Sequence, residues 1–128
     1  MNKEIIKPTD AELDILRTLW RFGPCSVRQV QENLQDAPPR GYTTVLKLLQ
    51  IMTRKGLVKR HKKNRAHIYE ASLSADQTQK NILSGVLNKV FDGSSHKLIM
   101  QALSSKPASR DELNKIRKLL DNLEGDSK

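Results

Sequence analysis

The sequence lacks several features on which whole classes of protein depend. It has one cysteine, Cys25, so no internal disulfide can form, and a lone thiol is typical of the reducing cytoplasm. No apolar run approaches the roughly 20 residues that cross a membrane. The first residues, MNKEIIKP, have no apolar core of the kind found in signal peptides. We therefore expect a cytoplasmic protein without membrane insertion.

The motifs of the common enzyme classes are also missing. The chain contains no HExxH metal motif, no glycine-rich phosphate loop and no pairing of a nucleophile with a base. Cys25 has no second cysteine and no histidine nearby, so we interpret it as a small buried hydrophobic residue. His61 and His67 have no third ligand in the sequence, which favours phosphate contacts over a metal site. We expect no catalytic residue, no metal and no cofactor, and thus not an enzyme.

Acidic residues are absent from one long stretch. No Asp or Glu occurs between Asp36 and Glu70, whereas nine Lys and Arg residues fall between Arg40 and Arg65. Residues 1–72 hold 14 Lys/Arg against 7 Asp/Glu, so +7 of the total charge of +9 belongs to this part. Such a segment repels itself unless it faces an anion. The backbone of double-stranded nucleic acid, with one charge per roughly 1.7 Å of duplex, fits this requirement. Aromatic residues make up only 4% of the chain, which disfavours single-strand binding by stacking.

The first half of the chain predicts two helices before this basic stretch. Thr9 and Glu12 form a capping box at the start of a helix that Gly23-Pro24 ends. Its apolar stripe, in which Trp20 is interpreted as a core residue, contains Ala11, Leu13, Ile15, Leu16 and Trp20. Cys25 to Val27 can pair as a short edge strand. Ser26 can cap a second helix whose inner face is Val27, Val30 and Leu34.

A third helix is predicted from Tyr42 to Lys55, after a loop at Asp36–Gly41 that Pro38-Pro39 keeps from being helical. Gly56 ends it. Spacing places Val45, Leu48, Leu49 and Met52 on its inner face. The other face carries side chains suited to base edges and phosphates, or to solvent alone: Thr43, Leu46, Lys47, Gln50 and Arg54.

A basic hairpin is predicted to follow this helix. Leu57 to His61 and Ala66 to Glu70 are its strands, with Ile68 or Tyr69 facing inward, and Lys62–Arg65 is its turn. Asn64 tolerates the left-handed conformation at such a tip. Three helices and a hairpin in this order predict a winged helix-turn-helix in residues 1–72, with the third helix in the major groove and the hairpin as the wing.

Residues 73–128 have a different composition and predict three further helices. We expect the first helix from Ser74 to about Phe91, followed by a break at Asp92-Gly93. A short helix begins at Ser94 or Ser95 and leads to a loop at Ser104–Ser109. The last helix begins with a Ser109–Glu112 capping box and frays at EGDSK. Helices this short cannot bury all their large apolar residues internally. We expect a homodimer instead of a monomeric bundle, with these contacts: Ile82, Leu83, Val86, Leu87, Val90, Phe91, Leu98, Ile99, Leu113, Ile116, Leu119 and Leu120.

The chain resembles the BlaI/MecI/CopY family of penicillinase-type repressors over about residues 7–123. The segments that carry the resemblance are TDAELDILRTLW, TTVLKLLQIMTRKGLV, KKNRAHIYEA and LNKVFDGS. It implies a mainly helical fold with a winged-helix domain and a three-helix dimerisation domain at 73–128. It also implies repression, by a homodimer, at promoter operators built on inverted TACA/TGTA-like elements. By position, it implies that Thr43, Thr44 and Lys47 read bases. Phosphate contacts fall to Tyr42, Arg54, Lys62, Lys63, Asn64 and Arg65, with Arg40 included among them.

Two departures from the family pattern bear on induction. The β-lactam-responsive members are cleaved at an Asn-Phe bond in the short dimerisation helix, where this chain has Gln101-Ala102. The copper-responsive members end in a CxC cluster, which LDNLEGDSK lacks. A membrane metalloprotease sensor is a partner that the resemblance suggests. Two alternatives stay open at this point: a winged helix that binds RNA or a protein partner, and a repressor that senses a small ligand.

Overall fold

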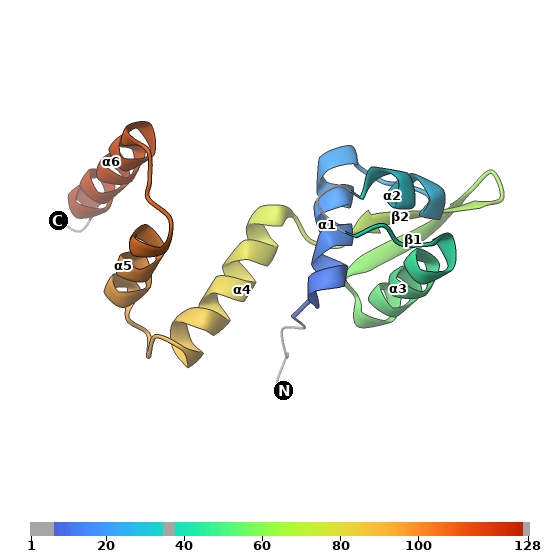
Figure 1. The fold of residues 1–128 in the computed structure, drawn as a ribbon, viewed down its shortest axis with the longest axis horizontal. Helices are drawn as coiled ribbons and strands as arrows, with labels where there is room; N and C mark the ends of the chain where they lie inside the picture. The colour runs from blue at the N-terminus through green and yellow to red at the C-terminus, as the bar shows by residue number, and fades with distance from the viewer. Residues whose placement is uncertain (1–6, 35–37, 127–128) are drawn as a thin grey trace. The chain divides into compact units, whose positions relative to one another are not determined.

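A computed structural model describes residues 7–34 and 38–126 of the chain. Its elements are α1 (Asp10–Phe22), α2 (Val27–Asn33), α3 (Tyr42–Lys55), β1 (Val58–Lys63), β2 (Ala66–Ala71), α4 (Ala75–Lys89), α5 (Ser95–Ser105) and α6 (Arg110–Asp126) (Figure 1). The chain forms two compact units, Met1–Leu83 and Ser84–Lys128. The boundary falls inside α4, and not at the 72/73 position at which we had divided the chain.

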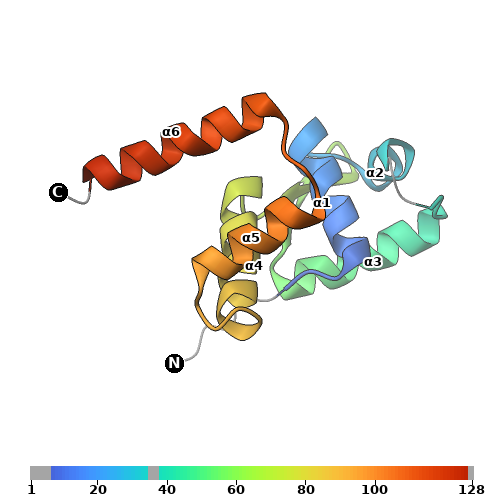
Figure 2. The same ribbon diagram turned by 60° about the vertical axis from the view of Figure 1, so that its left-hand side comes forward.

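The first unit is a winged helix-turn-helix, as predicted. The helices α1, α2 and α3 gather around the antiparallel hairpin of β1 and β2 (Figures 1 and 2). Pairing runs from Val58 opposite Ala71 to Lys63 opposite Ala66. One apolar core joins the helices to the hairpin, and it consists of Ile15, Leu16, Leu19, Cys25, Val27, Val30, Val45, Leu49, Met52, Val58 and Tyr69. The fold is therefore mainly helical with one small hairpin.

Local sequence signals place the ends of these helices correctly. The Thr9 hydroxyl accepts a hydrogen bond from the Glu12 N–H, and the Glu12 carboxylate accepts one from the Thr9 N–H, which completes the predicted capping box. At the end of α3, Gly56 adopts a left-handed φ of 80°. Trp20 is half-buried against the core, and its indole N–H donates to the Leu73 carbonyl oxygen at 2.9 Å. The core interpretation of Trp20 is confirmed.

The predicted edge strand at Cys25–Val27 is wrong in extent. Only Cys25 pairs, through two backbone hydrogen bonds with Tyr69, and the ring of Tyr69 is the inward-facing one. Ser26 already caps α2, so Val27 is helical. In the loop that we predicted at Asp36–Gly41, residues 36 and 37 lie outside the described residues, and residues 38–41 have no regular structure.

The hairpin turn is tighter than predicted. Lys62 and Lys63 belong to β1, opposite His67 and Ala66, so only Asn64 and Arg65 form the turn. Both turn residues have positive φ angles, 51° and 68°. We had expected a left-handed conformation at Asn64 alone.

Helices α5 and α6 each extend further at their C-terminal ends than the sequence predicted. Helix α5 continues through Ser105, so the loop that follows begins only at Lys106. Helix α6 continues to Asp126, through residues that we expected to fray, while residues 127–128 lie outside the described part. The caps at Ser74, Ser94 and Ser109 are confirmed by hydrogen bonds from the N–H groups three residues on.

The second unit has no buried residue among residues 84–125. Large apolar side chains are instead exposed on it, for example Val90, Ile99, Leu119 and Leu123. No helix in the described ranges has the length and apolarity needed to cross a bilayer.

Candidate nucleic-acid interface

The outer face of α3 is free of internal contacts. Thr43, Thr44, Lys47 and Gln50 are all exposed, and their side chains form no hydrogen bond or ion pair within residues 7–34 and 38–126. Leu46, which we had placed on this face, packs partly against the core instead. Hydroxyl, ammonium and amide groups without internal partners are able to bind base edges in a major groove.

The N-terminus of α3 is also open. Its N-cap residue is Gly41, which provides no side-chain hydrogen bond, whereas each of the other five helices is capped by a Thr or Ser hydroxyl. The first N–H groups of an uncapped helix have no partner within the helix, and together with the helix dipole they favour a phosphate. The reading face and the phosphate-binding end thus lie on the same helix.

Helix α1 holds α3 by charged pairs at both ends. Lys55, the last residue of α3, places its Nζ 2.9 Å from Oε2 and 3.0 Å from Oε1 of Glu12. Arg40, just before α3, places Nη1 3.4 Å from Oδ2 of Asp14. Both carboxylates come from α1, so α1 fixes the position of the reading helix at two points.

Glu12 is the buried member of this arrangement, with 2% of its surface exposed. Burial by itself raises the pKa of Glu12, but the Thr9 N–H and the Lys55 ammonium outweigh it, and the net pKa lies below the ordinary value. The carboxylate is therefore ionised at neutral pH. Sequence spacing identified Glu12 only as a capping residue, because Lys55 lies 43 positions away.

These two pairs correct the view that the basic stretch is uncompensated. Arg40 and Lys55 are neutralised by α1, and Arg40 is thereby less available for the DNA backbone than we expected. Seven of the nine cations keep no carboxylate partner in the part of the chain that the structure describes: Lys47, Arg54, Lys59, Arg60, Lys62, Lys63 and Arg65. All seven are exposed, and all lie on α3 or the hairpin.

The hairpin carries a histidine–carboxylate contact of its own. Nε2 of His61 lies 2.5 Å from Oε1 of Glu70 across the two strands. We had interpreted His61 as a phosphate contact, and this pairing makes it a partner of Glu70 in the free protein. His67 is exposed and lies opposite Lys62 in the strand register. Its side chain forms no hydrogen bond or ion pair with any described residue.

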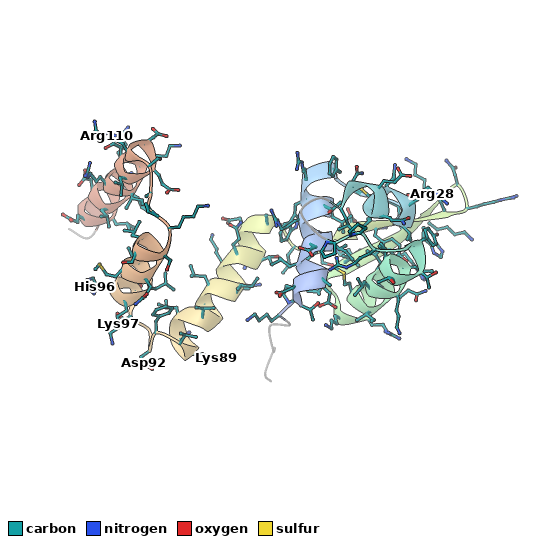
Figure 3. All side chains as sticks on the ribbon, in the orientation of Figure 1. Arg28, Lys89, Asp92, His96, Lys97 and Arg110 are labelled. Atoms are coloured by element: carbon teal, nitrogen blue, oxygen red, sulfur yellow. The ribbon has the colours of Figure 1, made fainter. Side chains whose placement is uncertain are left out.

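One charged residue near α3 was missed by sequence reasoning. The guanidinium of Arg28, on α2, lies over the ring of Tyr42 at 5.9 Å from its centroid (Figure 3). This contact holds the ring of the first residue of α3, and it brings one more cation to the open helix end. No sequence signal pointed to it, since the two residues lie on different helices.

Cys25 and the histidines form no metal site in the described ranges. No group of three or more His, Cys, Asp or Glu residues is placed there to hold an ion. Cys25 is buried, its Sγ donates to the Gly23 carbonyl oxygen at 3.1 Å, and burial raises the pKa of its thiol. The interpretation of Cys25 as a small buried residue is confirmed.

None of the twelve residues predicted to form a dimer interface is buried within its own unit. Exposure is greatest at Val90, at 67%, and at Leu119, at 56%. Lys89, Asp92, His96 and Lys97 lie around the junction of α4 and α5 (Figure 3), next in sequence to the apolar residues Val90, Phe91 and Leu98. Ten of the twelve residues belong to the second unit, and so many incompletely buried apolar side chains are typical of an interface.

Comparison with known proteins identifies related sequences along nearly the whole chain. The family model "Penicillinase repressor" matches residues 8–122. The penicillinase repressor of Bacillus licheniformis is 21% identical over 119 residues, covering 93% of each chain. The transcriptional regulator BlaI of Mycobacterium tuberculosis is 30% identical over 116 residues, covering 90% of this chain and 83% of the relative.

Solved structures show the same fold. The YusO protein from Bacillus subtilis is 17% identical, covers 91% of this chain and 74% of its own, and has a TM-score of 0.54. The transcriptional regulator Tm0710 from Thermotoga maritima gives a TM-score of 0.51 at 20% identity, over 91% of this chain and 74% of its own. At these identities the likeness concerns the arrangement of the elements alone.

Proposed function

Because this chain belongs to the penicillinase repressor family of DNA-binding transcriptional regulators, we propose that it represses promoters as a homodimer bound to a near-palindromic operator in the cytoplasm. The observation that carries the proposal is the outer face of α3, which is exposed and forms no hydrogen bond or ion pair with any described residue, together with seven cations on α3 and the hairpin that have no carboxylate partner in the same ranges. The phosphate-facing cations supply affinity, and the side chains on α3 supply specificity.

We assign base reading to Thr43, Thr44 and Lys47. A threonine offers a hydroxyl to any base and a methyl group to thymine, and lysine can bond the acceptors of guanine. The backbone contacts are Tyr42, Arg54, Lys62, Lys63 and Asn64, and Arg65, which the sequence also predicted to contact the backbone, is a DNA contact at the tip of the hairpin. Arg40 is a backbone contact only if a phosphate replaces Asp14 as its partner.

The second unit, with the first turns of α4, is assigned to dimerisation. Its apolar side chains are not buried within that unit, and a second copy offers the same surface in return, as two-fold symmetry requires. Two copies place two α3 helices on half-sites about one helical turn apart, roughly 34–36 Å. Inverted TACA/TGTA-like elements with that spacing are the expected operator.

Release from DNA follows from the loss of this bivalency. A separated protomer keeps one half-site only, and its affinity falls steeply. We propose a signal directed at the second unit, such as proteolysis by a membrane metalloprotease sensor, and at a site other than Gln101-Ala102. If the purified dimer leaves its operator on addition of a small molecule alone, this route is excluded.

The function is tested by binding to duplex and single-stranded DNA as a function of salt. With about five phosphate contacts per subunit, the log–log salt slope of the dimer on its operator should be near −9. Thr44→Ala should weaken operator binding by about 1–3 kcal/mol and leave binding to random DNA unchanged. Lys63→Ala should weaken both about equally. Tighter binding to single-stranded RNA than to any duplex would favour the alternative of an RNA-binding module.

A further inference from the structure

The tip of the wing has a backbone that its sequence does not favour. Asn64 and Arg65 connect β1 and β2 as a two-residue turn with positive φ at both positions, the arrangement of a type I′ turn. Such turns prefer Asn followed by Gly, because glycine has no side chain to crowd the left-handed backbone. Asn64 suits its position, whereas Arg65 occupies the position that glycine would take without strain.

No contact within the protein accounts for an arginine at this position. Its side chain is exposed, and it forms no hydrogen bond, ion pair or ring contact with any residue that the structure describes. Strained backbone of this kind is often found at binding sites, where a contact between the side chain and the bound partner offsets the strain. The contact that offsets the strain at Arg65 is therefore expected with a binding partner.

The hairpin places this residue at its tip. The loop that joins the two strands extends past the helices (Figure 1), and the pairing of Lys63 with Ala66 puts Arg65 in that loop. Lys62 and Lys63, as neighbours in one strand, point to opposite faces of the hairpin. This arrangement fits a DNA groove. The cations on the two faces can contact the phosphates on either side of the groove, and the cation at the tip can contact its floor.

The minor groove matches this tip. It is about 6 Å wide, too narrow for the hairpin itself but wide enough for a single extended side chain. Its negative potential is strongest where A·T-rich sequence narrows it, and arginine is attracted there. A guanidinium enters such a groove more readily than an ammonium, because it is more weakly hydrated.

We infer that Arg65 reads the shape of the minor groove flanking each operator half-site, and so gives the repressor a preference for A·T-rich flanks that α3 never touches. The inference rests on the proposed function, since it requires α3 to be seated in the adjacent major groove. It adds a second source of specificity, which depends on groove width and not on base-edge contacts.

The test uses the full-length protein and duplexes that share one TACA/TGTA inverted core but differ in their flanks. The flanks are A·T, G·C, or inosine·C, which has the major-groove face of G·C without the minor-groove amino group. Wild type should bind the duplexes with A·T or inosine·C flanks about tenfold more tightly than the duplex with G·C flanks. This ratio is similar to the affinity lost when one base pair of a site is mismatched. Arg65→Gly, which relieves the strained turn, should bind all three duplexes alike.

Two control variants separate groove reading from loss of charge. Lys59→Ala removes an unpaired hairpin cation away from the tip, and should lower all affinities while keeping the tenfold ratio. Arg65→Lys keeps the charge, and should keep most of the affinity for G·C flanks while losing most of the ratio.

Three results would overturn the inference. In the first, Arg65→Gly keeps the wild-type ratio. In the second, wild type binds the operator core without flank preference. In the third, Arg65→Gly lowers affinity equally on every flank and reduces the salt slope by about one, as a plain phosphate contact would. Each of these leaves operator binding intact. Failure of wild type to bind any of the duplexes more tightly than random DNA would instead remove the proposed function, and the inference with it.

Discussion

Removing the Lys55 ammonium tests whether the buried pair with Glu12 holds the reading helix in place. Lys55→Met keeps most of the aliphatic stem and leaves a carboxylate that is 2% exposed without its cation. Breaking a buried pair from one side costs about 3–5 kcal/mol. Lys55 itself is one-third exposed, so water can partly replace it, and we expect a loss of about 2–3 kcal/mol, just below that range. For a unit of this size, that loss lowers Tm by roughly 15 °C.

The pH dependence of this loss identifies its origin. In the wild type the pKa of Glu12 lies below 4.5, so its stabilising contribution is present above about pH 4.5 and is lost as the pH falls through the folded-state pKa. In Lys55→Met, the lowering effect of the Lys55 ammonium is lost while burial remains, so the pKa of Glu12 rises from its wild-type value. The free energy of unfolding of the variant is then reduced at neutral pH, where the buried carboxylate is ionised, and this reduction disappears as the carboxylate is protonated. The difference in stability between the two proteins should therefore shrink as the pH falls from 7 to 4.

The assay is denaturant unfolding followed by the fluorescence of Trp20, the only tryptophan, at a fixed protein concentration. Lys59→Met removes a hairpin cation that has no carboxylate partner in the described ranges, and should change stability by no more than about 0.5 kcal/mol. Glu12→Gln combined with Lys55→Met should recover much of the loss, because no buried charge remains. A Lys55→Met protein as stable as wild type, or a loss that is independent of pH, would refute the reasoning.

Further predictions concern three separate features. Arg65→Gly should raise the free energy of unfolding by about 1 kcal/mol in the absence of DNA, since glycine relieves the left-handed strain, and a lower value in urea denaturation would contradict this. Leu120→Asp should shift sedimentation at micromolar concentration from dimer to monomer while the circular dichroism spectrum is kept, and an unchanged dimer would place the interface elsewhere. Because burial raises the pKa of the Cys25 thiol, Ellman's reagent should label it at pH 8 only as fast as the unfolding of the first unit allows, and rapid labelling of folded protein would show that the thiol is accessible.

Signals that act over a few residues could be read from the sequence. The capping box of Thr9 and Glu12 spans three positions, and Gly56 stops α3 at the predicted residue. Both depend on backbone groups next to the residues that satisfy them. The order of helices and hairpin followed from such signals, and with it the winged helix-turn-helix.

Interactions between distant residues could not be read in the same way. Lys55 was counted as one more cation without a partner, because no residue near it in the sequence shows that Glu12 of α1 packs against it. The turn was predicted to span four residues because basic side chains were taken as turn residues, whereas strand pairing extends to Lys63. The fraying predicted for EGDSK is absent as far as Asp126, since α6 continues to that residue. Base reading by Thr43, Thr44 and Lys47 stays a prediction.

Anchoring and reading are performed by different surfaces of α3. Its inner face, Lys55 at its last position and Arg40 just before its first are held by α1 and the core. Thr43, Thr44, Lys47 and Gln50 form no hydrogen bond or ion pair with any residue that the structure describes. Substitutions at those four positions should therefore be almost free of folding consequences. A gene duplicate could acquire a new target site through a handful of changes there, and a protein engineer could retarget this scaffold by randomising the same positions.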